Sequence, residues 1–421
     1  MSYRIAAIDV HKMVLIVVVA TAAEEVKDTA AEALEFQCRR FGATAQERTH
    51  LIAWLQQQDV KEVVMESTAQ YWRPIWLDLE PQFPKLHLAQ AQSNRAPKGR
   101  KNDYRDAKRL ARRLLAGELM LSFVPGAEQR MWRELARTKE QYVQERVRVQ
   151  NRIECHLEEM RIKLSGVITD LLGVSGRRIL TALANGETNP DQLAELGDER
   201  LQCGKEKLID ALRGSPTPVQ IQILKLHLEM LSKIDALIES LDRLLAEALN
   251  KHQEAVMRLA EMPGLGVDSA QRLIAEIGVD AETFPSADEF ASWFGGCPGS
   301  NITAEQNHGS GSPKGNRFVR KLLTQAAQAA VRKKGSRYQS LFRRFLPRLS
   351  FTGAIWAVAH RMGRLVWKIL HDGVRYIEYG DETTPQARKR REQKLKQAFR
   401  KLGYAVTLTP LNPDPQLALE G

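Results

Sequence analysis

Two acids three residues apart open a segment in which most other polar side chains are basic. Asp103 and Asp106 begin a predicted helix, and their spacing puts both carboxylates on one face of its first turn. Between Arg95 and Arg113 they lie among nine Lys or Arg residues. Paired acids in a basic field are typical of a metal site that faces a polyanion. Acids in a first turn can also simply complement the helix dipole.

A third acid interrupts an apolar run near the start of the chain. Ile5–Val10 and Met13–Ala20 are rich in β-branched residues and predict two strands joined by a short turn. Asp9 belongs to the first of them. A carboxylate in a buried strand is unfavourable unless it is paired or binds a metal. The alternative interpretation is an acid at a strand end that accepts hydrogen bonds from turn amides.

The segments between these acids predict a mixed α/β layer that could position them. Ala31–Gln58 is predicted as a helix, Val60–Met65 as a strand that ends at Glu66, and Leu86–Ala89 as a further strand. The Asp103 helix follows. Strand ends and one helix face then supply four carboxylates, an all-oxygen ligand set that suits Mg²⁺.

Composition favours an anionic partner. The 421-residue chain has 62 Lys and Arg against 51 Asp and Glu, giving a net charge of +11 and a pI near 9.5. Four cysteines are scattered without a Cys-x-x-Cys pair and indicate neither a disulfide framework nor a zinc site, which favours a reducing cytoplasm. The apolar run Val14–Ala20 is too short to span a bilayer, so we expect no membrane location. We expect a nucleic-acid backbone to be held near the paired acids by Lys98, Arg100, Lys101, Arg105 and Arg109.

The middle of the chain changes to a long helical pattern. Apolar residues recur at three-to-four spacing from Gly126 to Leu164 and again over Val219–Leu259, with a looser helical insert over Gly173–Pro218. Two long amphipathic helices joined in this way predict an antiparallel coiled-coil arm. Such an arm is typical of oligomerisation or of a rigid spacer.

The C-terminal region contains two glycine-rich signals. Gly264 and Gly266 precede a predicted helix within Met262–Gly278, where backbone N–H groups can hold a phosphate. The pattern resembles a helix-hairpin-helix element, and the alternative is a plain interhelix turn. The long segment Trp293–Asn316, called here the hydroxyl loop, is rich in glycine and hydroxyl side chains. Such a loop between two well-patterned helical segments favours a functional role.

The acids match a known family in order and in context. The chain resembles, over nearly all of its length, the DEDD transposases of bridge-RNA-guided insertion sequences, which are related to the Piv-type DNA invertases. The matching residues are Asp9 in Ile-Ala-Ala-Ile-Asp-Val, Glu66 in Val-Val-Met-Glu-Ser-Thr, and Asp103 and Asp106 in Asn-Asp-Tyr-Arg-Asp-Ala. The resemblance implies that these four acids are the catalytic metal ligands.

The resemblance also implies a fold and a division into domains. An α/β RuvC-like (RNase H-like) catalytic domain is expected at residues 1–125 and a long antiparallel coiled-coil arm with a helical insert at residues 126–260. A mostly α-helical C-terminal transposase domain with the hydroxyl loop and a helix-hairpin-helix-like element is expected at residues 261–380. A basic, partly disordered tail completes the chain at residues 381–421.

The family pattern implies a nucleophilic serine five residues after the proline of a Pro-Gly pair. Here that proline is Pro298, and the position holds Thr303. Threonine offers the same hydroxyl, but its methyl group crowds the oxygen and stiffens χ1. Thr303 is therefore the predicted nucleophile, with Ser300 as the alternative and an inactive copy as a third reading. Nucleic-acid contacts are expected at Gly264, Gly266, Lys314 and Asn316.

These matches imply a Mg²⁺-dependent transposase, with one or two ions, that cleaves and rejoins DNA strands through a hydroxyl nucleophile. A structured non-coding (bridge) RNA is expected to guide it, and the protein is expected to be a homo-oligomer, either a dimer or a tetramer, in the bacterial cytoplasm at the nucleoid. Two alternatives stay open. One is a RuvC-like structure-specific or junction nuclease that uses water, and the other is a binding-only nucleic-acid assembly protein.

Overall fold

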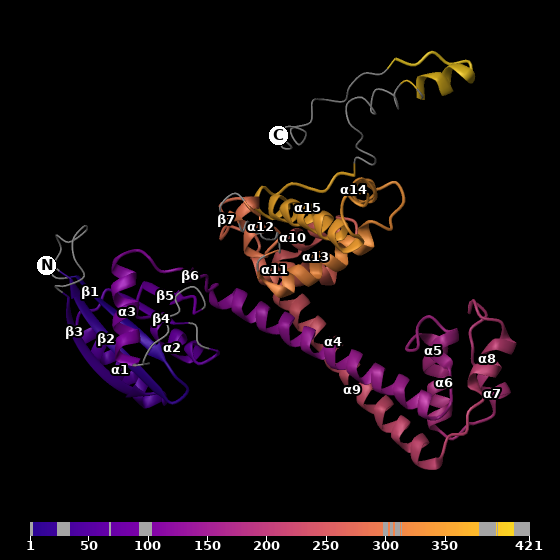
Figure 1. Ribbon diagram of the computed structural model, residues 1–421, viewed down its shortest axis with the longest axis horizontal. Helices are drawn as coiled ribbons and strands as arrows, with labels where there is room; N and C mark the ends of the chain where they lie inside the picture. Colours follow the sequence, from indigo (N-terminus) through magenta and orange to yellow (C-terminus); the bar gives the residue numbers. More distant parts are fainter. Residues whose placement is uncertain are drawn as a thin grey trace. The chain divides into compact units, whose positions relative to one another are not determined.

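The chain divides into two compact units in the computed structural model, Met1–Gly126 and Ala127–Gly421 (Figure 1). The structure describes residues 3–22, 34–66, 69–91, 103–297, 302–303, 306–307, 312, 314–378, 393 and 395–407. The expected domain boundaries at residues 125, 260 and 380 stay predictions. Most of the predicted basic tail, residues 381–421, lies outside the described residues.

Six strands form the sheet of the first unit in the order β3-β2-β1-β4-β5-β6. β1 pairs antiparallel with β2 and parallel with β4, β4 pairs parallel with β5, and β2 with β3 and β5 with β6 are antiparallel. Because β1 is central and covered on both faces, its sequence is an almost continuous apolar run. The strands are β1 Tyr3–Val10, β2 Val14–Ala22, β3 Glu35–Gly42, β4 Glu62–Glu66, β5 Lys85–Ala89 and β6 Leu121–Ser122.

Helices cover the two faces of this sheet unequally. Two helices, α1 and α2, pack on the face that carries Ile8 and Met65, and one helix, α3, packs on the opposite face against Ala7 through Leu110. Alternation along β1 therefore divides its side chains between the two helical layers. This α/β architecture confirms the predicted fold class of the N-terminal part. The helices are α1 Ala45–Gln57, α2 Trp72–Leu79 and α3 Asp103–Leu115.

The prediction of one helix over Ala31–Gln58 is wrong for its first half. Glu35–Gly42 is the strand β3, which pairs antiparallel with β2 along its whole length. The helix-forming residues of this segment are overridden because the open edge of β2 needs a hydrogen-bonding partner. Helix α1 then begins after Thr44, whose side chain accepts a hydrogen bond from the backbone N–H of Glu47.

Two long helices of the second unit run antiparallel to each other. These are α4, Ala127–Glu159, and α9, Pro218–Ala248. The direction follows from three contacts between them, which join Lys139 to Asp242, Arg146 to Asp235 and His156 to the backbone carbonyl of Gln220. The predicted pair of long helices is confirmed over these spans, and its classification as a coiled coil stays a prediction.

Four shorter helices lie between the end of α4 and the start of α9. Three of them, α6, α7 and α8, fall within the helical insert predicted for Gly173–Pro218, and α5 precedes it. They share one hydrophobic cluster with the adjacent parts of the two long helices, in which Ile153 and Leu231 are buried. The helices are α5 Leu164–Val167, α6 Val174–Ala184, α7 Pro190–Glu195 and α8 Lys205–Leu212.

The described helices of the second unit that follow α9 pack around Phe290 and Phe294, which are both fully buried. The predicted helix over Val219–Leu259 is wrong as a single element, because α9 ends at Ala248 and the fully buried Leu249 leads into a new turn. The break lets the next helix pack on α11 and α15 instead of continuing along the arm. The elements are η1 Asn250–His252, α10 Gln253–Ala260, α11 Val267–Ile277, α12 Ala287–Trp293, α13 Arg317–Ala330, α14 Arg337–Phe345 and α15 Phe351–His371.

None of the helices among the described residues combines the length and the apolar character that crossing a bilayer requires.

Candidate metal centre and hydroxyl loop

Asp9 and Glu66 lie at the same edge of the central sheet. β1 and β4 are parallel, and Ile8 is aligned with Met65, so the next residue on each strand is one of the two acids. Ile8 and Met65 face the α1 and α2 layer. Side chains alternate along a strand, which directs Asp9 and Glu66 to the opposite face, the one covered by α3. Asp9 is only 9% exposed and Glu66 is half-buried.

Helix α3 brings the other two acids to this face. Ala107 and Leu110 anchor the helix on the sheet, and Asp103 and Asp106 precede them in its first turn. Both acids are half-buried. Asp106 lies 3.9 Å from the guanidinium of Arg109, measured from Oδ1 to Nη2. The predicted placement of two acids on the first turn of a helix is therefore confirmed.

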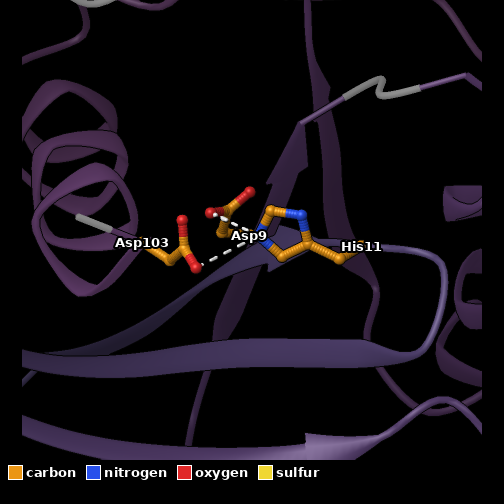
Figure 2. A group of neighbouring side chains, drawn as sticks. All are labelled: Asp9, His11 and Asp103. Carbon is orange, nitrogen blue, oxygen red and sulfur yellow. Dashed lines mark ion pairs between the residues drawn. The ribbon is translucent and has the colours of Figure 1, made fainter. Parts of the chain in front are cut away.

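A histidine joins two of these acids (Figure 2). The Nε2 atom of His11 lies 3.2 Å from Oδ2 of Asp9 and 3.6 Å from Oδ2 of Asp103. One ligand atom from each of the three residues falls within 4.8 Å of the others. The Nε2 atom is buried and has no hydrogen-bond partner among the described residues. Two carboxylates and an imidazole nitrogen therefore converge at one point, as the ligands of a divalent ion do.

His11 was not among the predicted site residues. It lies in the tight turn between β1 and β2, where its backbone N–H donates to the carbonyl of Val14 over 3.0 Å. Residues two apart in an extended chain share a face, so a histidine two positions after Asp9 was the available signal. The three-residue group does not include Glu66 or Asp106, so their part in a metal site stays a prediction.

The expected basic residues are only partly described. Lys98, Arg100 and Lys101 lie outside the described residues. Arg105 is exposed on α3, and Arg109 is half-buried near Asp106. Phosphate binding by these two residues stays a prediction.

The hydroxyl loop contains a short hairpin. β7, Ile302–Thr303, pairs antiparallel with β8, Gln306–Asn307, so Thr303 is the last paired residue before the turn. Ser300 and the side chain of Thr303 lie outside the described residues. The choice between these two hydroxyls stays a prediction.

The C-terminal end of this loop is fixed by close packing. A Cβ atom on Gly315 would lie 2.1 Å from the carbonyl carbon of Phe294, so only glycine fits there. Asn316 accepts hydrogen bonds from the backbone N–H groups of Phe318 and Val319 and caps α13. Its Nδ2 donates to Glu276 over 2.9 Å. Gly315 and Asn316 therefore anchor the end of the loop, while Lys314 just before them is exposed.

Glu276 is the centre of a buried ion cluster. It is 1% exposed and receives two hydrogen bonds from Arg137 of α4, at 2.7 and 2.9 Å. Arg133 donates to its backbone carbonyl. The cluster links α4 and α11 to Asn316, the N-cap of α13. The C-terminal end of the hydroxyl loop is therefore connected to α4 through Glu276.

The two predicted phosphate-binding glycines lie between α10 and α11. Gly264 has a φ of +86°, and a Cβ atom there would lie 2.1 Å from the carbonyl oxygen of Ala326 on α13. Gly266 precedes the first residue of α11. Gly264 therefore has a packing role, and phosphate binding at this turn and its assignment as a helix-hairpin-helix stay predictions.

Two family models match the chain in the regions that carry these features. A DEDD transposase model covers residues 6–162, which include all four acids and His11. A model of the transposase IS116/IS110/IS902 family covers residues 256–343, which include Gly264, the hydroxyl loop and Asn316. Together the matches span more than half of the chain.

The chain belongs to the DEDD transposases of the IS110 type. A transposase acts on DNA, so membership implies an enzyme that cuts and rejoins DNA strands. No curated protein matches the chain. In this transposase Asp9, His11 and Asp103 bring together donors for a divalent metal of the kind that the family typically uses.

Proposed function

We propose that this transposase is a Mg²⁺-dependent recombinase that moves an insertion element by cutting and rejoining DNA through a protein hydroxyl. The convergence of Asp9 and Asp103 from separate segments of the first unit carries this proposal. The strand order, in which an antiparallel β3-β2-β1 meander is followed by the parallel strands β4 and β5, supports an RNase H-like catalytic domain.

The four acids would hold one or two ions. Asp9, Glu66, Asp103 and Asp106 provide oxygen donors on a single face of the sheet. When bound there, Mg²⁺ would neutralise the scissile phosphate and stabilise the leaving oxygen. Arg105 and Arg109 would orient the neighbouring backbone by charge.

Thr303 is the proposed nucleophile. Its Oγ1 would form a bond to phosphorus while the bond from phosphorus to the departing sugar oxygen breaks, and the hydroxyl proton would pass to that oxygen. One phosphoester bond of the DNA is thus replaced by one phosphoester bond to Thr303, so the number of phosphoester bonds does not change. A hydroxyl of a second strand then reverses the exchange and releases Thr303, so that rejoining needs no external energy source.

The choice of DNA site would fall to a structured non-coding RNA, as the family resemblance implies, in the bacterial cytoplasm. The long antiparallel helices α4 and α9 support assembly into a dimer or tetramer. In such an assembly the hydroxyl loop of one subunit could serve the acids of another.

Trapping the covalent intermediate tests this function. The full-length protein is incubated with Mg²⁺, DNA that carries the flanks of its own coding sequence, and RNA transcribed from those flanks. Denaturation followed by peptide mass spectrometry should find a phosphoester on Thr303. Thr303→Ala should form none, and Thr303→Ser should restore it.

Other outcomes separate the alternatives. An adduct on Ser300 would overturn the choice of nucleophile. Normal cleavage by a Thr303→Ala, Ser300→Ala double variant would favour a junction nuclease that uses water. Tight RNA binding without any Mg²⁺-dependent cleavage would favour a binding-only protein.

A further inference from the structure

A stretch of the C-terminal domain lacks acidic residues altogether. No Asp or Glu occurs between Glu305 and Asp372, although this stretch contains 14 Lys or Arg residues. It includes α13, α14 and α15. The basic excess of the chain is therefore concentrated in part of one domain.

Several of these cations have partners within the protein. Lys321 donates to the buried carboxylate of Glu140, and Arg364 lies 3.5 Å from Asp288. Arg320 stacks on Trp356, with 4.5 Å between the guanidinium carbon and the ring centroid. These cations have a structural role that needs no ligand.

Six others are exposed and have no acidic partners among the described residues. They follow α13, lie on the C-terminal part of α14 or lie just beyond it, and all six are exposed. We call this group the basic patch. It consists of Arg332, Lys333, Lys334, Arg343, Arg344 and Arg348.

The helix beneath the basic patch is firmly anchored. Tyr338 of α14 is 2% exposed. Ser336 caps the helix by accepting from the N–H of Gln339 over 3.1 Å, and its hydroxyl donates to the carbonyl of Ala330. Phe342 packs edge-on against Phe351 with ring centroids 5.5 Å apart. The patch is thus held on an ordered support, which favours a preformed binding surface over a loose solvated tail.

We propose that the basic patch binds the phosphate backbone of duplex DNA. Six like charges within 17 residues repel one another, and a polyanion relieves this repulsion while it releases its own counterions. The inference rests on the proposed function in that it takes DNA as the substrate. It assigns a backbone contact outside the metal centre, and such contacts set register and affinity rather than sequence preference.

The salt dependence of DNA binding tests the basic patch. The full-length triple variant Arg343→Gln, Arg344→Gln, Arg348→Gln is titrated with a 40-base-pair duplex at several salt concentrations. If all three side chains contact phosphates, the slope of log K against log salt should fall by about 2 to 3. Affinity at about 150 mM salt should fall about tenfold or more.

The matched control is a triple variant that removes three positive charges from α9 and the end of α8. Arg213, Lys225 and Lys233 are exposed, and their replacement by Gln should leave the slope unchanged. An unchanged slope in the patch variant, or an equal fall in the control, would overturn the proposal. So would a loss confined to a single-stranded or structured RNA probe, which would assign the patch to RNA.

The same titration separates this inference from the proposed function. Asp103→Asn should bind the duplex with the wild-type slope while it fails to cut. Cleavage by that variant would contradict the metal-centre assignment and leave the patch intact. If the triple variant of the basic patch keeps the wild-type salt slope and also cuts normally with Mg²⁺, DNA binding by the basic patch is contradicted and the proposed function is not.

Discussion

The Nε2 atom of His11 lies 3.2 Å from Oδ2 of Asp9, two residues earlier in the chain. The same nitrogen lies 3.6 Å from Oδ2 of Asp103. An imidazole therefore lies between two of the four acids that are the predicted metal ligands, within the region that the DEDD transposase model matches. Imidazole nitrogen suits Mn²⁺ and later transition metals better than Mg²⁺, which prefers oxygen ligands.

Removal of His11 should change the metal preference of the centre. We expect His11→Ala to weaken Mn²⁺ binding about tenfold and to change Mg²⁺ binding much less, because only the nitrogen donor is lost. Electron paramagnetic resonance of free Mn²⁺, with Mg²⁺ as competitor, measures both affinities without any cleavage. His50→Ala is the control, since His50 is an exposed residue of α1. Equal Mn²⁺ affinities in wild type and His11→Ala would exclude His11 as a ligand.

The buried ion cluster of the second unit should be essential for stability. Glu276→Ala leaves Arg133 and Arg137 without their buried carboxylate, which should cost about 3 to 5 kcal/mol. Thermal unfolding followed by circular dichroism should show a lower Tm for this variant.

The matched control for this cluster is Glu254→Ala. The Glu254 side chain is 87% exposed and pairs with Arg258 one turn later, so its loss should leave Tm unchanged. If the Tm of Glu276→Ala equals that of the wild type, the buried ion cluster contributes no net stability.

Much of the candidate site could be predicted from the sequence. Asp9 was recognisable because it interrupts an apolar run and Glu66 because it ends one, and the parallel pairing of their strands then puts them at one edge. The spacing of Asp103 and Asp106 fixed their common face on α3. His11 was missed because its only signal is its position two residues after Asp9, and a turn residue at that spacing need not continue the alternation of the strand.

The errors in the fold have a common physical origin. Residues 35–42 contain good helix formers, but the edge of β2 imposes a strand on them. The apolar period of the arm continues past Leu249, although the backbone turns there to bury α10 in the C-terminal domain. In both cases a tertiary contact that no local pattern encodes decides the outcome.

A lower pH should destabilise the packing of α9 on α4 and α6, where Asp235 forms ion pairs with Arg146 and Arg177. Burial disfavours its charged form, but hydrogen bonds from Arg177 and Arg146 outweigh burial and hold the pKa of Asp235 below its ordinary value of 3.8. A lowered pKa in the folded state contributes stability above pH 4, and that contribution is lost as the pH falls through the folded value.

Melting curves from pH 7 to pH 3 test this contribution. Asp235→Asn should melt below the wild type at pH 7, and the two Tm values should approach each other below about pH 4. A difference in Tm that stays constant over the whole range would contradict the assignment, because a neutral amide does not titrate.

The central claim is that the acids on the α3 face form the metal centre that cuts DNA. The most direct measurement is the Mg²⁺-dependent rate of strand cleavage by Asp103→Asn, on DNA and RNA taken from the flanks of the coding sequence. Glu118→Gln is the control, because Glu118 is an exposed acid beyond the end of α3. We predict that Asp103→Asn loses about 1,000-fold in rate while it keeps its affinity for DNA, and that Glu118→Gln cuts normally. Cleavage by Asp103→Asn at the wild-type rate would contradict the account.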